Sequence, residues 1–305
     1  MPTDERVVAI VVNWNGREVL PATLDALRST LHPNLEIVVV DNGSTDGSAN
    51  QVRDPVRVAP LAENLGYGGA LNSVLRRSIP GAEDGSSPAA QYFLLLNNDI
   101  LVEPETVSRL LETAREKGPG VYGPKVLLQE RPNRLDAAWG RITWSHVLTS
   151  FRGKGARDGG RYDRVRRVQL LLGCALLVHR RVFEDVGFFD EDYFMYHEEV
   201  DFLFRAERRG YRSYFCPAAR VYHRRAHSTR HDPLKRVFWV RRNAVLFLRK
   251  HRAGAWAWGC WGKSLVLSLV WNVVLMRWRR VATIWRGVVA GMGGEISEAP
   301  RRGDF

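Results

Sequence analysis

Residues 92–104 read YFLLLNNDILVEP, a run of five hydrophobic residues followed by Asn97, Asn98 and Asp99. The hydrophobic run predicts a buried strand. A strand does not need three polar residues at its end, so their presence indicates a function. In open α/β sheets, ligands bind at the carboxyl ends of the strands, where these side chains would lie. The stretch therefore predicts both a sheet and a binding edge.

Similar runs on the N-terminal side predict three more strands, at residues 7–12 (VVAIVV), 36–40 (EIVVV) and 57–59. Helical spacing is found between them, at residues 19–29, from about residues 44–46, and at 68–78. Polar residues again follow two of the strands, at 13–15 and 41–42. Near-continuous apolar strands that alternate with helices predict an α/β fold, with a Rossmann-like, mainly parallel sheet covered by helices on both faces.

The second half of the chain is expected to add further elements to this fold. The pattern predicts helices at residues 181–187 and 198–209, and strands at 211–216 and 220–223. Glycine-rich and polar stretches predict loops at residues 81–88 and 153–160. From Pro233 onward the pattern becomes helical and basic.

The composition is that of a folded protein in a reducing compartment. The 305 residues suffice for one large α/β domain with an appendage, and 45% of them are hydrophobic. Cys174, Cys216 and Cys260 are widely spaced and odd in number, which indicates neither a disulfide framework nor a metal site. Asp4 and Glu5 near the N-terminus do not fit a signal peptide, so we expect a cytoplasmic protein.

The net charge of +12 is concentrated near the C-terminus. Residues 224–286 hold fifteen lysines and arginines against one acidic residue, Asp232. Aromatic and basic side chains are interleaved there: Trp256, Trp258, Trp261, Trp271, Trp278, Trp285, Arg277, Arg279, Arg280 and Arg286. Stacking aromatics and arginines also suit single-stranded nucleic acid, but the apolar stretch 265–276 favours lipid. We therefore expect no nucleic-acid partner.

The apolar stretch is short for a membrane span. The uncharged run from Ser264 has 13 residues, below the roughly 20 that a confident span needs. We expect helices that lie on the anionic inner face of the cell membrane, with tryptophans at the interface. In the alternative interpretation, these helices pack on the catalytic domain.

Two nucleotide-binding interpretations compete for the sheet edge. Asp41 could hold the ribose of a dinucleotide, but the loop at residues 13–17 (NWNGR) offers one glycine where GxGxxG is needed. Hydride transfer is therefore disfavoured. In the second interpretation Trp14 stacks on a base, Asp41 accepts hydrogen bonds from base or ribose, and Asp99 holds a divalent cation on a diphosphate.

Five segments together resemble one known family. They are VVNWNG (residues 11–16), VVVDNGSTDGS (38–48), ENLGYGGALN (63–72), LLLNNDILVEP (94–104) and YFMYHEEVDFLFR (193–205). In this order they resemble the motifs of the inverting glycosyltransferases of family 2, with the GT-A fold, and especially the bacterial rhamnosyltransferase-like members. The resemblance covers about residues 7–250.

The resemblance implies a metal site on the sheet edge. NND resembles the family's Asp-x-Asp motif, so Asp99 is the expected ligand of Mg²⁺ or Mn²⁺, and Asn97 replaces the first aspartate. His223 matches a position where similar enzymes place a histidine on the metal. A turn-capping role for the asparagines and aspartate stays open at this stage.

The resemblance also implies a general base and a nucleotide-sugar site. The second acid of the pair Glu198 and Glu199 would take the proton of the acceptor hydroxyl, and Asp201 shares a helix face with Glu198. Stabilisation of the helix dipole is the competing role for these acids. Nucleotide-sugar contacts are expected at Trp14, Asn15, Asp41, Asn42, Asn64, Gly66, Gly69, Asn97, Asn98 and Gly173.

These features predict a metal-dependent inverting glycosyltransferase that uses dTDP-rhamnose, or else a UDP sugar, on a saccharide or polyprenyl-linked acceptor. A catalytically weak sugar-nucleotide-binding or assembly protein at the membrane is the alternative. The expected domains are a catalytic domain at 1–232, divided near residue 127, and a basic helical extension at 233–305 with a disordered tail from about 292.

Overall fold

The structure is a computed structural model that describes residues 5–79, 90–224 and 233–293. The loop predicted at 81–88 and most of the predicted tail lie outside these ranges. The chain divides into two compact units, each described by itself below. The first unit comprises residues 1–140, 151–192 and 198–225, and the second comprises 141–150, 193–197 and 226–305. The domain boundaries expected at 127 and 232 stay predictions.

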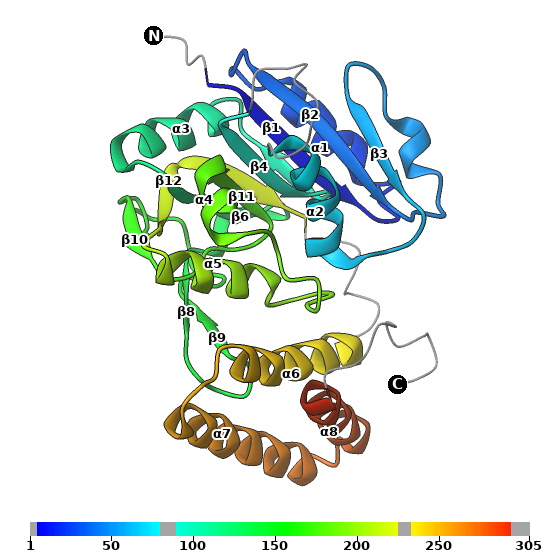
Figure 1. Cartoon of the computed structure of the whole chain (residues 1–305), viewed down its shortest axis with the longest axis vertical. Helices are drawn as coiled ribbons and strands as arrows, with labels where there is room; N and C mark the ends of the chain where they lie inside the picture. The colour runs from blue at the N-terminus through cyan, green and yellow to red at the C-terminus, as the bar shows by residue number, and fades with distance from the viewer. Residues whose placement is uncertain (1–4, 80–89, 225–232, 294–305) are drawn as a thin grey trace. The chain divides into compact units, whose positions relative to one another are not determined.

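The first unit is built on a ten-stranded sheet whose first half is parallel (Figure 1). β1 (Val7–Asn13) lies between β2 (Leu35–Asn42) and β4 (Tyr92–Asn97). β3 (Arg57–Leu61) pairs with the other side of β2. All four predicted N-terminal strands are therefore present. Their carboxyl ends lie at one edge of the sheet because they run in the same direction.

The other half of the sheet is mixed. β11 (Ala175–His179) runs antiparallel between β4 and β6 (Gly120–Leu128), and β12 (Arg212–His223) runs parallel to β6. β12 is one bulged strand where two strands were predicted. Short antiparallel partners complete the sheet: β5 (Ile100–Val102), β7 (Arg131–Ala137) and β10 (Arg166–Val168). A separate two-stranded sheet pairs β8 (Gly140–Ile142) with β9 (Thr149–Phe151).

The helices of this unit are close to their predicted positions. The predicted ones are α1 (Leu20–Arg28), α2 (Gly66–Ser78), α4 (Arg180–Val186) and α5 (Glu198–Arg208). A further helix, α3 (Thr106–Lys117), was not predicted. The helix predicted from residues 44–46 was wrong, since only a 3₁₀ turn forms there, at Ser48–Gln51. Gly43 and Gly47 adopt positive φ angles, which interrupt a right-handed helix.

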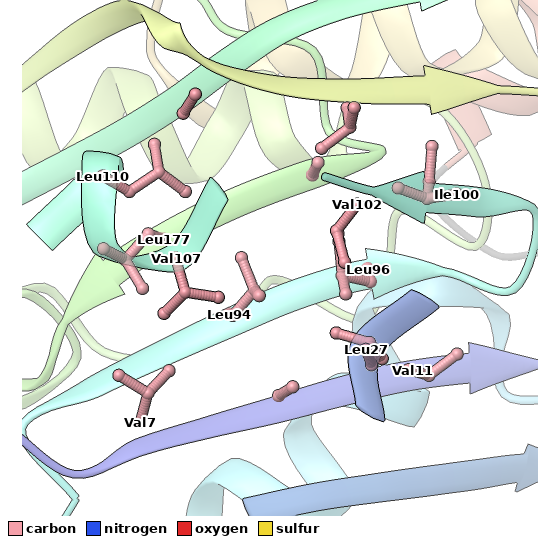
Figure 2. Close-up of a cluster of buried hydrophobic side chains, with 14 of the residues drawn as sticks. Val7, Val11, Leu27, Leu94, Leu96, Ile100, Val102, Val107, Leu110 and Leu177 are labelled. Atoms are coloured by element: carbon pink, nitrogen blue, oxygen red, sulfur yellow. The ribbon is translucent and has the colours of Figure 1, made fainter. Parts of the chain in front are cut away.

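Hydrophobic side chains from strands and helices form one core on a face of the sheet (Figure 2). Val7 and Val11 of β1 and Leu94 of β4 contribute from the sheet, and Leu27 of α1 and Leu110 of α3 contribute from the helices. All seven residues of β1 are buried, so both faces of the central strand are covered. This confirms the predicted α/β class and holds the polar strand ends on a rigid support.

The second unit contains three helices: α6 (Pro233–Lys250), α7 (Ala255–Val274) and α8 (Trp278–Gly293). α8 packs closely on α6, because a Cβ at Gly287 or Gly291 would meet a backbone oxygen of α6 at 2.7 or 2.5 Å. Within the described ranges, no helix is both long enough and apolar enough to cross a bilayer.

Candidate functional site

The polar ends of three neighbouring strands form one hydrogen-bonded network. Asn13 Nδ2 at the end of β1 donates to Asp41 Oδ1 at 3.2 Å and to Ser48 Oγ at 2.8 Å. Asn98 Nδ2 after β4 donates to Asn13 Oδ1 at 2.9 Å. A Cβ at Gly16 would come within 2.2 Å of Asn98 Nδ2, so only glycine leaves this network intact. Asn13 and Gly16 were not among the predicted site residues.

The loops beside this network are held by their own side chains. Asn15, at φ +50°, receives the backbone N–H of Thr45 on Oδ1 at 2.8 Å. Asn42 Nδ2 donates to Asn64 Oδ1 at 2.9 Å, and Asn64 Oδ1 also receives Gly66 N at 2.9 Å. These contacts give the predicted nucleotide-binding asparagines a role in fixing the loop. Their predicted contacts with a nucleotide stay predictions.

Trp14 retains surface toward solvent at this edge, whereas Asp41 does not. Trp14 is half-buried, and Asp41 is buried beside Asn13. Gly69 lies in α2, where a Cβ would meet Leu65 Cβ at 2.9 Å. The lack of a side chain at Gly69 therefore leaves room for Leu65, which precedes the helix. Gly66 is the first residue of the helix and has a positive φ of 75°.

Asp99 and His223 lie together, with Asp136 behind them. His223 Nε2 is 3.4 Å from Asp99 Oδ1, and His223 Nδ1 is 2.6 Å from Asp136 Oδ2. The antiparallel pairing of β12 with β5 brings His223 opposite Ile100, next to Asp99 in the chain. Burial lowers the pKa of His223, but the two carboxylates outweigh it and raise the pKa to about 9. Without a cation, this group is an imidazolium between two carboxylates.

The same residues fit a divalent cation that is bound mainly through a diphosphate. Two ligands about 2.1 Å from one cation and at right angles to each other are about 3 Å apart, close to the observed 3.4 Å. Asp136 fixes the ring so that Nε2 points to Asp99, as partners of metal-binding histidines do. Among the described residues, no cluster of three or more such ligands occurs. Phosphate oxygens would have to complete the coordination, as is common for Mg²⁺.

The acidic residues of α5 divide into different environments. Asp201 is 1% exposed and accepts Arg205 Nε at 2.7 Å, which favours a structural role. Glu198 is buried, and its Oε2 receives no hydrogen bond. Burial, followed by the charge of Glu199, raises the pKa of Glu198 well above its ordinary value. Glu199 is half-buried and is therefore the acid of this pair better able to carry charge.

Tyr67 and Cys174 link the acidic pair to Asp99. Burial raises the pKa of Tyr67, and the charges of Glu198, Glu199 and Asp99 raise it further. Burial likewise raises the pKa of the Cys174 thiol, with contributions from Asp136, Asp99 and Glu199. Glu199 and Asp99 thus both act on Tyr67 and on Cys174. Tyr67 was not predicted, because a tyrosine inside a glycine-rich helix start has no chemical signature.

Gly173 lies directly against Glu199. A Cβ on Gly173 would be 3.0 Å from Glu199 Cγ and 3.2 Å from its Cβ. The carbonyl of Gly173 also accepts the Tyr67 hydroxyl at 3.0 Å. The glycine therefore defines the position of the predicted base, in addition to the expected contact with the sugar nucleotide.

The loop before α5 is anchored on α2. Asn72 Nδ2 donates to Phe189 O at 2.8 Å and to Glu191 Oε1 at 2.7 Å. Asp190 Oδ1 accepts Asp192 N at 3.1 Å, so Asp190 has a turn role. This anchoring fixes the approach to α5.

Replacing Glu198 by glutamine is expected to stabilise the fold increasingly with pH. A raised pKa means that the folded state keeps a proton that the unfolded state loses above about pH 4.5. The advantage of glutamine should therefore grow by up to about 1.4 kcal/mol per pH unit above that value. Urea unfolding of both proteins at pH 5 and pH 8 measures it. A difference that does not change with pH would contradict the raised pKa.

Replacing Gly173 by alanine is expected to lower kcat by about 10- to 100-fold, because the new methyl group displaces Glu199 by a few tenths of an ångström or more. Thermal stability should change little. Gly159→Ala is the matched control, since a Cβ there meets nothing within 4 Å. Equal kcat in both variants would show that Gly173 does not position Glu199.

Comparison with known proteins identifies relatives across most of the chain. Residues 8–187 match the family described as Glycosyl transferase family 2. An N-acetylglucosaminyl-diphospho-decaprenol L-rhamnosyltransferase of Mycobacterium tuberculosis is 30% identical over 269 residues, which cover 81% of this chain and 85% of the relative.

Two solved structures are similar in fold. The mannosyltransferase PcManGT from Pyrobaculum calidifontis, in complex with GDP-Man and Mn²⁺, has a TM-score of 0.57 at 18% identity, covering 96% of this chain and 87% of that one. GalNAc-T7 with UDP, GalNAc and Mn²⁺ has a TM-score of 0.60 at 15% identity, covering 80% of this chain and 48% of that one. These similarities confirm the predicted fold.

Proposed function

The chain belongs to glycosyl transferase family 2, and from that membership we propose that it transfers L-rhamnose from dTDP-rhamnose to a hydroxyl group of a saccharide or lipid-linked saccharide. That the protein is a glycosyltransferase follows from the family. The choice of rhamnose is supported by the 30% identity to an L-rhamnosyltransferase. Such a reaction would serve the synthesis of cell-surface polysaccharide.

The main support for the mechanism is that Glu199 packs on Gly173 and that Asp99 lies 3.4 Å from His223. The charges of both acids also raise the pKa of Tyr67 and of Cys174. In the proposed reaction, Glu199 takes the proton of the acceptor hydroxyl as that oxygen attacks the anomeric carbon. Attack from the face opposite the leaving group inverts the configuration at this carbon. Gly173 keeps Glu199 in position, and the pKa of the neighbouring Glu198 is raised by its burial.

Asp99 and His223 would hold Mg²⁺ or Mn²⁺, with Asp136 orienting the histidine. When bound, the cation supplies a Lewis acid that offsets the charge growing on the diphosphate. Trp14 would stack on the base, and Asp41 would accept hydrogen bonds from base or ribose.

The proposed activity is tested with purified full-length protein, dTDP-rhamnose, and saccharide acceptors with and without a prenyl diphosphate. Release of dTDP that requires acceptor and Mn²⁺ or Mg²⁺ is the expected result. UDP sugars in place of dTDP-rhamnose should support turnover at least tenfold less well. Faster turnover of a UDP sugar would contradict the donor assignment, and turnover undiminished by EDTA would contradict the metal.

We also propose that the second unit docks on an anionic membrane. Large hydrophobic side chains are exposed on α7, α8 and the turn between them: Trp256, Val266, Leu267, Val270, Trp271, Val273, Val274, Leu275, Met276, Trp278, Trp285, Val289 and Met292. The described residues of this unit include thirteen lysines and arginines but no aspartate or glutamate. A surface that is both apolar and basic suits anionic headgroups over an acyl layer.

Replacing Trp271 by glutamate is expected to weaken binding to phosphatidylglycerol vesicles by at least about tenfold, because a buried aromatic contributes about 2–3 kcal/mol. Trp271 is 62% exposed, so the fold should tolerate the change. Leu31→Glu, at a 67% exposed site of the first unit, is the control. Co-sedimentation measures binding, and equal loss in both variants would overturn this docking surface.

A further inference from the structure

Two adjacent arginines of α6 are almost fully buried, and they differ in their contacts. Arg242 Nη1 donates to Asn243 Oδ1 at 2.9 Å, and its guanidinium lies 5.7 Å from the centre of the Trp239 ring. Arg241 is 5% exposed, and its Nε is buried without a hydrogen bond. Within the described residues, no ion pair or hydrogen bond reaches the Arg241 side chain.

The described residues of the second unit place basic but no acidic side chains around Arg241. Since the described residues of the second unit contain no carboxylate, none is available there to neutralise this cation. Burial, and then the charge of Arg280, lowers the pKa of Arg241 to about 10. Burial, together with the charge of Arg241, lowers the pKa of both His146 and His197 to about 4. A cation that is 5% exposed and whose Nε lacks a hydrogen bond is costly, and a bound anion would offset that cost.

His197 presents a second buried group without a partner. Its Nε2 donates to Val147 O at 3.2 Å, which leaves Nδ1 buried and without a hydrogen bond. An anion beside Arg241 would favour protonation of this nitrogen, which could then donate to the anion. Arg241 would thus attract an anion through its positive charge. His197 would donate a hydrogen bond to the same anion once its Nδ1 is protonated.

An apolar helix is tied to this cluster. The hydroxyl of Ser264 in α7 accepts the backbone N–H of His146 at 3.2 Å and also bonds to His146 Nδ1. α7 exposes Val266, Leu267 and Val270 shortly beyond Ser264. A ligand with a multivalent anionic group and a long hydrocarbon chain matches both features.

We propose that Arg241, with Arg280 and His197, forms a binding site for the diphosphate of a prenyl diphosphate. This inference rests on the proposed function, because a lipid-linked saccharide acceptor would present that group. The planar guanidinium of Arg241 can bind two phosphate oxygens at once, which suits a diphosphate. The exposed apolar residues of α7 would lie along the prenyl chain.

The test measures binding of farnesyl diphosphate and inorganic pyrophosphate to the full chain in EDTA, so that no divalent cation loads the donor site. Arg241→Met is expected to raise the Kd for both probes at least tenfold. It should leave Tm unchanged or raise it, because the variant loses an uncompensated buried charge. Arg252→Met, at an exposed arginine of the same unit, should change the Kd less than twofold.

Three further arms make the outcome decisive. Arg241→Lys keeps the positive charge but lacks the planar guanidinium, so it should raise the Kd by a smaller factor than Arg241→Met does. This variant provides the test if Arg241→Met does not fold. Vesicles with phosphatidylglycerol but no diphosphate should bind wild type and Arg241→Met alike. Asp99→Asn should bind farnesyl diphosphate like wild type but lose the Mn²⁺-dependent binding of dTDP-rhamnose. Arg241→Met should bind dTDP-rhamnose like wild type but bind farnesyl diphosphate more weakly.

Equal Kd values for wild type, Arg241→Met and Arg241→Lys would overturn the site. So would Arg241-dependent binding of the vesicles, since phospholipid headgroups would then be the ligand. If wild type bound farnesyl diphosphate but did not bind dTDP-rhamnose, the proposed donor would be contradicted. The diphosphate site would still be supported.

Discussion

Replacing Glu199 by glutamine is expected to lower kcat by about 10³-fold and to leave the affinity for dTDP-rhamnose within twofold of wild type. A positioned general base contributes about 10²- to 10⁴-fold, and glutamine cannot accept the proton. The amide keeps the size of the side chain, so its packing against Gly173 should be preserved. Steady-state turnover and calorimetric binding of the donor separate the two effects.

Glu198→Gln provides the matched control for this prediction. Glu198 is buried with a raised pKa, which makes it less suited than the half-buried Glu199 to act as a charged base. Its amide variant should keep kcat within about tenfold of wild type. If instead Glu198→Gln lost most of the activity and Glu199→Gln little, the roles of the two acids would be exchanged.

Replacing Asp99 by asparagine is expected to remove most of the Mn²⁺-dependent affinity for dTDP-rhamnose, by about 10³-fold, and to lower turnover to a similar extent. A bound cation contributes several kcal/mol of charge stabilisation, and Asp99 is the only carboxylate in the NND motif. Asparagine keeps the shape but loses the charge. Calorimetric titration of the donor with Mn²⁺ and with EDTA measures the change.

Asp192→Asn is the control for Asp99, because it removes the same charge from an exposed loop position. This variant should bind the donor like wild type under both conditions. If Asp99→Asn bound the donor with the same dependence on Mn²⁺ as wild type, the cation would have to be held elsewhere.

The parallel half of the fold was predictable because its strands are buried on both faces. Such strands read as continuous hydrophobic runs, and residues 7–12, 36–40 and 92–96 lie within observed strands. β11 was not predicted. Its antiparallel position between β4 and β6 depends on pairing between segments far apart in the chain, which no local pattern reveals.

The site was predictable only in part, for the same reason. Asp99 and His223 were singled out from motifs, and the structure brings them within 3.4 Å. Asp136 escaped prediction because its role depends on β7 pairing with β6, which no motif indicates. The metal-binding and catalytic roles of the predicted residues stay predictions that the variants above test.

The central claim is that Asp99 and His223 hold the cation on which the departing diphosphate is bound. The most direct measurement is anomalous diffraction from crystals grown with Mn²⁺ and dTDP-rhamnose. We expect a manganese peak within about 2.5 Å of an Asp99 oxygen and of His223 Nε2, with the diphosphate on the same ion. A manganese ion bound to the diphosphate but contacting neither residue would contradict it.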